Sequence, residues 1–131
     1  MTDLNFNNKQ QDRRFTSIAK RRLIVATKNS MVGLATCFKH EEAFRIQGII
    51  AIVALPSIYW VADNVMEGLL LLFVTVLMMI TELLNSAIET AVDRVGMDYH
   101  ELSKRAKDIA SAAVFFAILL TAVTWLTLII T

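Results

Sequence analysis

Long stretches without charge are the feature that most constrains this sequence. Three of them lie at 48–62, 68–80 and 109–130. The hydrocarbon core of a bilayer is about 30 Å thick, and about 20 mostly apolar helical residues are needed to cross it. The third stretch has that length, the first reaches it with residues 44–47, and the second reaches it by continuing through Glu82 toward Val92. We therefore expect an all-α membrane protein with three spans, at about 44–62, 67–94 and 107–130.

The positions of the basic residues support the same three spans independently of hydropathy. All 13 Lys and Arg residues fall within 9–45 and 94–107, whereas the short connection at 63–67 is acidic. Cytoplasmic loops carry an excess of Lys and Arg, so the N-terminus and the second connection are predicted to be cytoplasmic. The basic face would attract anionic lipid headgroups, and we expect no nucleic acid partner.

The segment before the first span divides into two parts. Residues 1–12 are polar and contain few apolar side chains, which predicts a mobile tail. Residues 13–40 alternate basic and apolar side chains at helical spacing, as expected of an amphipathic helix lying in the membrane interface. Residues 13–131 would then form one membrane domain.

A polar face on the second span is the strongest functional signal. On a helical wheel Asn85, Ser86, Glu89 and Asp93 cluster around Glu82. A carboxylate near the bilayer midplane costs at least about 2.5 kcal/mol, and such residues usually face protein or a water-filled cleft. The ordinary explanation is that these acids are neutral, or paired with Lys and Arg to hold an oligomer together. Their alignment beside a basic loop instead favours a polar site near the cytoplasmic headgroups.

The spacing of the acids restricts the chemistry of that site. Glu82 and Glu89 are seven residues apart, which separates their backbones by about 10 Å along a helix. The deeper Glu82 suits a general base, and the shallower Glu89 suits a Mg²⁺ ligand. A second ligand would come from Glu41 or Glu42, where the interfacial helix meets the first span. The cations between residues 98 and 108 could receive a polyphosphate, although the sequence has no glycine-rich P-loop.

Several runs of residues resemble the small bacterial diacylglycerol kinase family. These runs are ELLNSAIETAVDR at 82–94, YHELSKRAKD at 99–108, SAAV at 111–114 and EAFR at 42–45. The resemblance extends over roughly residues 22–127. It implies a homotrimer with three membrane helices and one surface helix per chain, and with sites between neighbouring subunits. It also implies transfer of phosphate from MgATP to diacylglycerol, giving phosphatidic acid, at the cytoplasmic face of the bacterial inner membrane. The distribution of Lys and Arg, rather than the resemblance, predicts that the C-terminus is periplasmic.

The resemblance also implies roles for individual residues. Glu82 occupies the position of the catalytic base, and Glu41 and Glu89 the positions of the metal ligands. The implied nucleotide contacts are Arg22, Asn29, Asp98, Tyr99, His100, Lys107 and Asp108. The implied lipid-site residues are Asn85, which also lies beside the base, Ser111 and Arg45.

Two positions depart from the family pattern. An aromatic residue usually precedes the serine at position 30, but Asn29 stands here. An acid is common at position 47, where this sequence has Gln47.

Two other functions are compatible with these features. The nearest is the same chemistry on undecaprenol, which related family members phosphorylate. The more distant is a small proton-coupled transporter or channel subunit in which Glu82 titrates, since intramembrane acids also mark proton pathways. The grouping of Glu41, Glu89, Lys107 and Asp108 at one cytoplasmic level favours MgATP over a pore.

Overall fold

The computed structural model describes residues 2–96 and 98–131, with residues 2–15 and 17 described by their backbone alone. The described residues form four helices in the order α1 (Thr2–His40), α2 (Glu42–Val61), α3 (Val65–Val95) and α4 (Glu101–Ile130). The expected all-α class is confirmed. Helix α1 begins at Thr2 rather than near residue 13, since no Gly or Pro interrupts residues 2–32.

The chain divides into two compact units, residues 1–36 and 37–131. The first unit consists of most of α1. The second contains the end of α1 together with α2, α3 and α4. These last three helices are each long and apolar enough to cross a membrane, which confirms the prediction of three spans. Placement of α1 in the membrane interface stays a prediction.

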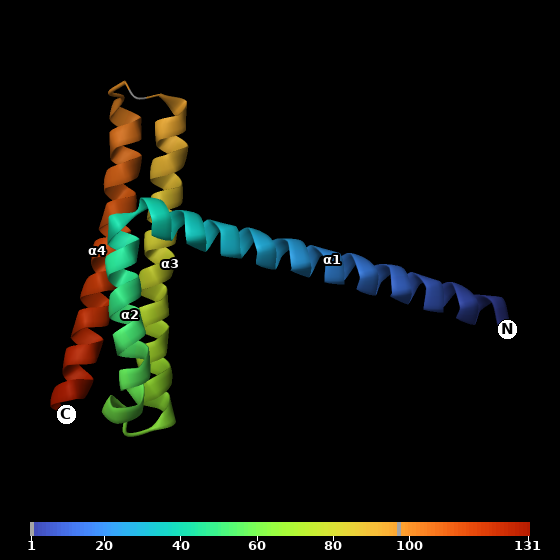
Figure 1. Ribbon diagram of the computed structural model, residues 1–131, viewed down its shortest axis with the longest axis horizontal. Helices are drawn as coiled ribbons and strands as arrows, with labels where there is room; N and C mark the ends of the chain where they lie inside the picture. The colour runs from blue at the N-terminus through green and yellow to red at the C-terminus, as the bar shows by residue number, and fades with distance from the viewer. Residues whose placement is uncertain (1, 97) are drawn as a thin grey trace. The chain divides into compact units, whose positions relative to one another are not determined.

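Within the second unit, α3 is the central helix. It packs against both α2 and α4. Figure 1 shows that α2 descends, α3 returns and α4 descends again, and that α3 and α4 continue together beyond the beginning of α2. The connection between α3 and α4 therefore stands at one end of the unit, while the turn between α2 and α3 lies at the other.

Helix α3 begins with a hydrogen-bonded cap. The Asn64 side chain accepts a hydrogen bond from the Glu67 backbone N–H at 3.1 Å. In return the Glu67 carboxylate accepts hydrogen bonds from the Asn64 amide at 2.7 Å and from the Asp63 N–H at 2.9 Å. This arrangement is close to a capping box, which satisfies N–H groups that have no partner within the helix. It fixes the short turn that makes α2 and α3 antiparallel neighbours.

The buried core of the second unit is small. Leu71, Val74 and Thr75 of α3 are the largest fully buried side chains among the described residues. Most large apolar side chains elsewhere are exposed in the single chain, as expected where lipid replaces water. Tyr59 and Trp60 stand exposed near the end of α2, where an aromatic pair suits the boundary between lipid and water.

Two hydrogen bonds join α4 to α3 across this core. Thr121 donates from its hydroxyl to the Val74 carbonyl at 3.0 Å. Trp125 donates from its indole N–H to the Thr75 hydroxyl at 3.0 Å. Contacts of this kind add specificity to helix pairs in a bilayer, where apolar burial alone gives no driving force.

We expect Thr75→Val to lower the free energy of unfolding by about 1 kcal/mol, because it removes the acceptor of the Trp125 indole while conserving side-chain shape. Thermal unfolding in detergent would measure the change. Thr127→Val is the matched control, because Thr127 is exposed and its hydroxyl donates only to Val123 of its own helix. Equal melting temperatures for the two variants would contradict the contribution of this contact.

Candidate active site

The polar face of α3 turns into the second unit, as the helical wheel predicted. Glu82 is only 4% exposed, and Asn85 and Ser86 are also buried. Glu89 is half-buried, and Asp93 is exposed. The face therefore runs from the interior at Glu82 toward the surface at Asp93, along about three turns of one helix.

The Glu82 carboxylate is held by a neighbouring helix. Gln47 of α2 donates from Nε2 to Glu82 Oε2 at 2.8 Å, and Gln47 is itself 5% exposed. The oxygen of the same amide, Gln47 Oε1, is buried and has no hydrogen-bond partner among the described residues. The sequence showed that Gln47 departs from the family pattern but gave no sign of this pairing.

The Glu89 carboxylate is held in a similar way by its own helix. Asn85 donates from Nδ2 to Glu89 Oε1 at 2.9 Å, while Asn85 Oδ1 is buried without a partner in the described part of the chain. The ion pairs among the described residues join Lys104 to Asp108 and Lys107 to Asp93. Neither Glu82 nor Glu89 takes part in one of these pairs. Within one chain, then, the acids are held by neutral amides, and pairing with Lys or Arg does not account for their burial.

Glu41 joins the same group from the beginning of α2. It is the N-cap residue of that helix, with extended backbone, and its side chain is half-buried. The carboxylates of Glu41 and Glu89 both lie close enough to Glu82 to act on it electrostatically. The structure thus brings together the three acids that the sequence singled out.

The donor set of Glu41 and Glu89 is compatible with Mg²⁺. The described residues contain no group of three or more His, Cys, Asp and Glu side chains arranged to hold a metal ion. Mg²⁺ at phosphoryl-transfer sites, however, uses only one or two carboxylates, because water and phosphate oxygens complete its shell. Two half-buried carboxylates that both approach Glu82 meet that requirement.

A hollow lies where α3 ends and α4 begins. It has a volume of about 510 Å³, and it brings together five of the seven residues predicted to contact nucleotide, namely Asp98, Tyr99, His100, Lys107 and Asp108. Ser103, Lys104 and Asp93 also line it. Both acidic and basic side chains line this hollow.

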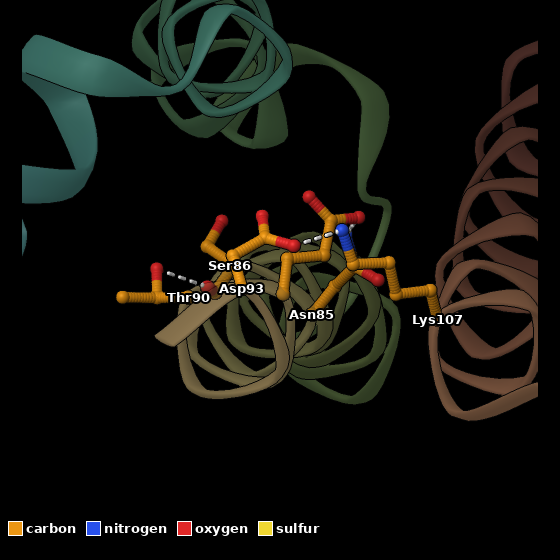
Figure 2. Close-up of polar contacts among 6 residues, drawn as sticks. Asn85, Ser86, Thr90, Asp93 and Lys107 are labelled. Carbon is orange, nitrogen blue, oxygen red and sulfur yellow. Dashed lines mark hydrogen bonds and ion pairs between the residues drawn. The ribbon is translucent and has the colours of Figure 1, made fainter. Parts of the chain in front are cut away.

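The cations of the hollow are already paired. Lys107 of α4 donates to Asp93 of α3, and Figure 2 shows its ammonium group reaching across the space between the helices. Lys104 pairs with Asp108 one turn along α4 at 2.6 Å. The pairing of Asp93 with Lys107 was not foreseen, because the sequence separation of 14 residues gives no periodic signal for it.

Two predicted site residues also have local structural roles. His100 is the N-cap of α4, and its Nδ1 accepts a hydrogen bond from the Leu102 N–H at 3.2 Å. Arg45 donates from Nη1 to the carbonyls of Phe38 and Lys39 at 3.3 and 3.1 Å, at the end of α1. Such contacts satisfy carbonyls that a helix end leaves free. The cap at His100 starts α4 ahead of residue 107, so Lys107 lies inside the helix.

The remaining predicted residues lie outside these two groups. Arg22 and Asn29 belong to the first unit, where they line a shallow hollow of about 360 Å³ on one face of α1. Ser111 is exposed on α4. Their roles in nucleotide and lipid binding stay predictions.

A family model described as prokaryotic diacylglycerol kinase matches residues 28–129, which include the three acids and the hollow between α3 and α4. The chain belongs to the prokaryotic diacylglycerol kinase family. Among the predicted site residues only Arg22 precedes the matched segment.

Individual members of the diacylglycerol kinase family are also similar to this chain over most of their length. The diacylglycerol kinase of Haemophilus influenzae is 44% identical over 103 residues, which cover 79% of this chain and 87% of the relative. That of Escherichia coli K12 is 44% identical over 104 residues, covering 79% and 85%. That of Pseudomonas aeruginosa is 41% identical over 110 residues, covering 84% and 89%. Membership of a lipid kinase family favours the kinase prediction over the transporter.

We expect the pair of Asp93 and Lys107 to contribute little to stability. Both side chains are partly exposed, and exposed ion pairs typically contribute less than about 1 kcal/mol. A double-mutant cycle with Asp93→Asn and Lys107→Met, followed by unfolding in detergent, would give the coupling energy. A coupling above about 2 kcal/mol would show instead that the pair is a structural link between α3 and α4.

Proposed function

We propose that this chain is an ATP-dependent lipid kinase that converts diacylglycerol to phosphatidic acid at the cytoplasmic face of the inner membrane. The observation that carries the proposal is the burial of Glu82 beside two shallower acids, in a chain of the diacylglycerol kinase family. A buried carboxylate without a cationic partner in its own chain is costly in a membrane helix. A role as proton acceptor would explain why such a costly residue is present.

The two substrates would approach from different phases. Diacylglycerol would move within the bilayer until its free hydroxyl reaches Glu82. ATP would enter from water at the hollow between α3 and α4. Because α3 passes from Glu82 to Asp93 in about three turns, a single helix carries both the proposed base and one wall of the hollow.

In the transfer itself, the protein would form no covalent bond to the phosphoryl group. Glu82 accepts the proton of the lipid hydroxyl as that oxygen bonds to the terminal phosphorus of ATP, and the bond to ADP breaks. Phosphatidic acid and ADP then leave, and Glu82 returns the proton to water. Positioning and charge stabilisation supply most of the rate in reactions of this class.

Glu41 and Glu89 would hold Mg²⁺ with the nucleotide. The ion, when bound, neutralises negative charge on the phosphates. Asn85 would orient Glu89 through the hydrogen bond that it already donates to that carboxylate.

The Lys residues of the hollow would exchange partners when nucleotide binds. Lys107 pairs with Asp93, and Lys104 with Asp108, and all four side chains are partly exposed. Exposed pairs are weak, so a polyphosphate can displace the carboxylates at low cost. In this proposal Asp98, Tyr99 and His100 contact the nucleotide from the connection. Arg22 and Asn29, in the first unit, remain proposed nucleotide contacts. Arg45 and Ser111 remain proposed contacts to the lipid.

The working unit in this proposal is a homotrimer with sites between neighbouring subunits, as the family resemblance implies. One face of α3 is apolar and exposed in the single chain, and it could pack against a neighbouring copy. The N-terminus would be cytoplasmic and the C-terminus periplasmic, as the distribution of Lys and Arg predicts.

We expect Glu82→Gln to reduce phosphatidic acid formation at least about 100-fold, because general bases contribute about 10² to 10⁴ in rate. The assay would follow labelled ATP with diacylglycerol in mixed micelles, with the oligomer checked by native mass measurement. Asp63→Asn is a matched control, since Asp63 is an exposed acid at the opposite end of the helices. Full activity of Glu82→Gln would overturn the base assignment.

A further inference from the structure

Gln47 is a buried polar residue that contacts Glu82, the proposed base. The two side chains belong to different helices, α2 and α3, and both are more than nine-tenths buried. Their contact joins Gln47 Nε2 to Glu82 Oε2 at 2.8 Å, a normal hydrogen-bond length. Gln47 is therefore the group on α2 that meets the proposed base directly.

The direction of this hydrogen bond fits the reactive state of Glu82. An ionised carboxylate only accepts hydrogen bonds, and the amide of Gln47 donates one. With Glu82 Oε2 held in this way, rotation of the carboxylate is restrained, and the other carboxylate oxygen, Glu82 Oε1, has a fixed direction. A fixed acceptor oxygen is what in-line transfer from a lipid hydroxyl requires.

The oxygen of the same amide could serve the protonated state of Glu82. After the proton transfer Glu82 is a carboxylic acid, which has a hydrogen to donate. Gln47 Oε1 is a buried acceptor without a partner among the described residues. A half-turn of the amide would bring this oxygen to the new acid, so one side chain can serve both protonation states without a change of charge.

The unpaired oxygen also argues against a purely structural role. A buried acceptor without a partner destabilises a fold, and an apolar residue of similar length would fill the space without that cost. An ionised acid at position 47 would repel the Glu82 carboxylate unless the two shared a proton. A neutral amide avoids both competition for the proton and repulsion.

We propose that Gln47 is a positioning residue, which donates a hydrogen bond to Glu82 through Nε2 while Glu82 is a base, and which accepts a hydrogen bond from the protonated Glu82 at Gln47 Oε1 after the transfer. This inference rests on the proposed function, because it presupposes that Glu82 accepts the hydroxyl proton. Gln47 itself does not contact the reacting atoms in this scheme.

The test compares three substitutions at this position in the full-length protein. Gln47→Met matches the length of the side chain but has no donor, and Gln47→Asn keeps the amide but is too short to reach. We expect both to lower kcat for phosphatidic acid formation about 10- to 100-fold, the loss typical of a slightly misplaced catalytic group. The KM values for ATP and diacylglycerol should change much less. Gln47→Glu should retain more kcat than Gln47→Met, because two carboxyl groups that share a proton restore a hydrogen bond.

Two controls separate positioning from stability and from the base assignment. Thr75→Val removes a buried hydrogen bond of α3 outside the site, so it should change the melting temperature but not kcat. Glu82→Gln is measured in the same assay. An inactive Glu82→Gln together with a wild-type kcat in folded Gln47→Met would overturn the positioning role alone. An active Glu82→Gln would overturn the base assignment itself.

If Gln47→Met does not fold, the comparison of Gln47→Asn with Gln47→Glu carries the test. Infrared spectra give a second readout that does not depend on turnover, because the carboxyl band lost in Glu82→Gln identifies Glu82. That band should shift in Gln47→Asn, which loses the contact. An unshifted band, or equal kcat values for the Asn and Glu substitutions, would contradict the proposal.

Discussion

The hydrogen bond between Gln47 and Glu82 is the interaction on which the rest of the site depends. It satisfies a carboxylate buried within a membrane-spanning helix, where no Lys or Arg of the described chain pairs with it. It also ties α2 to α3 at the level of the acids, so that Glu41, at the beginning of α2, lies close enough to Glu82 to act on it electrostatically. This one hydrogen bond to a neutral amide lowers the free-energy cost of burying the acid and also fixes its position.

A difference in depth along α3 separates the two halves of the proposed reaction. Glu82 is buried among the helices, Glu89 is half-buried, and Asp93 is exposed at the hollow that holds Lys107. In the proposed reaction, a lipid hydroxyl could thus approach from the bilayer and a nucleotide from the aqueous phase without a large movement of the backbone. In the proposed function, the weak ion pairs at the hollow would keep its cations in place until phosphate replaces the carboxylates.

Most of the architecture was predictable because it follows from the length of the apolar stretches and from helical periodicity. The three spans followed from bilayer thickness, and the buried face around Glu82 followed from helical periodicity. The contacts of Gln47 with Glu82 and of Asp93 with Lys107 could not be predicted, since they depend on how separate helices pack. The cap at His100 and the contacts of Arg45 were also missed, because residues that resemble ligand contacts can serve helix ends as well. The continuation of α1 back to Thr2 shows that a polar composition did not by itself end the helix.

Lipid-dependent phosphorylation is the most direct measurement of the central claim that the buried acids form the site of a diacylglycerol kinase. Purified protein would be given labelled ATP with diacylglycerol, with undecaprenol, or with neither lipid. The expected result is formation of labelled phosphatidic acid that requires diacylglycerol and exceeds labelling of undecaprenol. Preference for undecaprenol would move the chemistry to another alcohol. Failure to transfer phosphate to either lipid would contradict the kinase function itself.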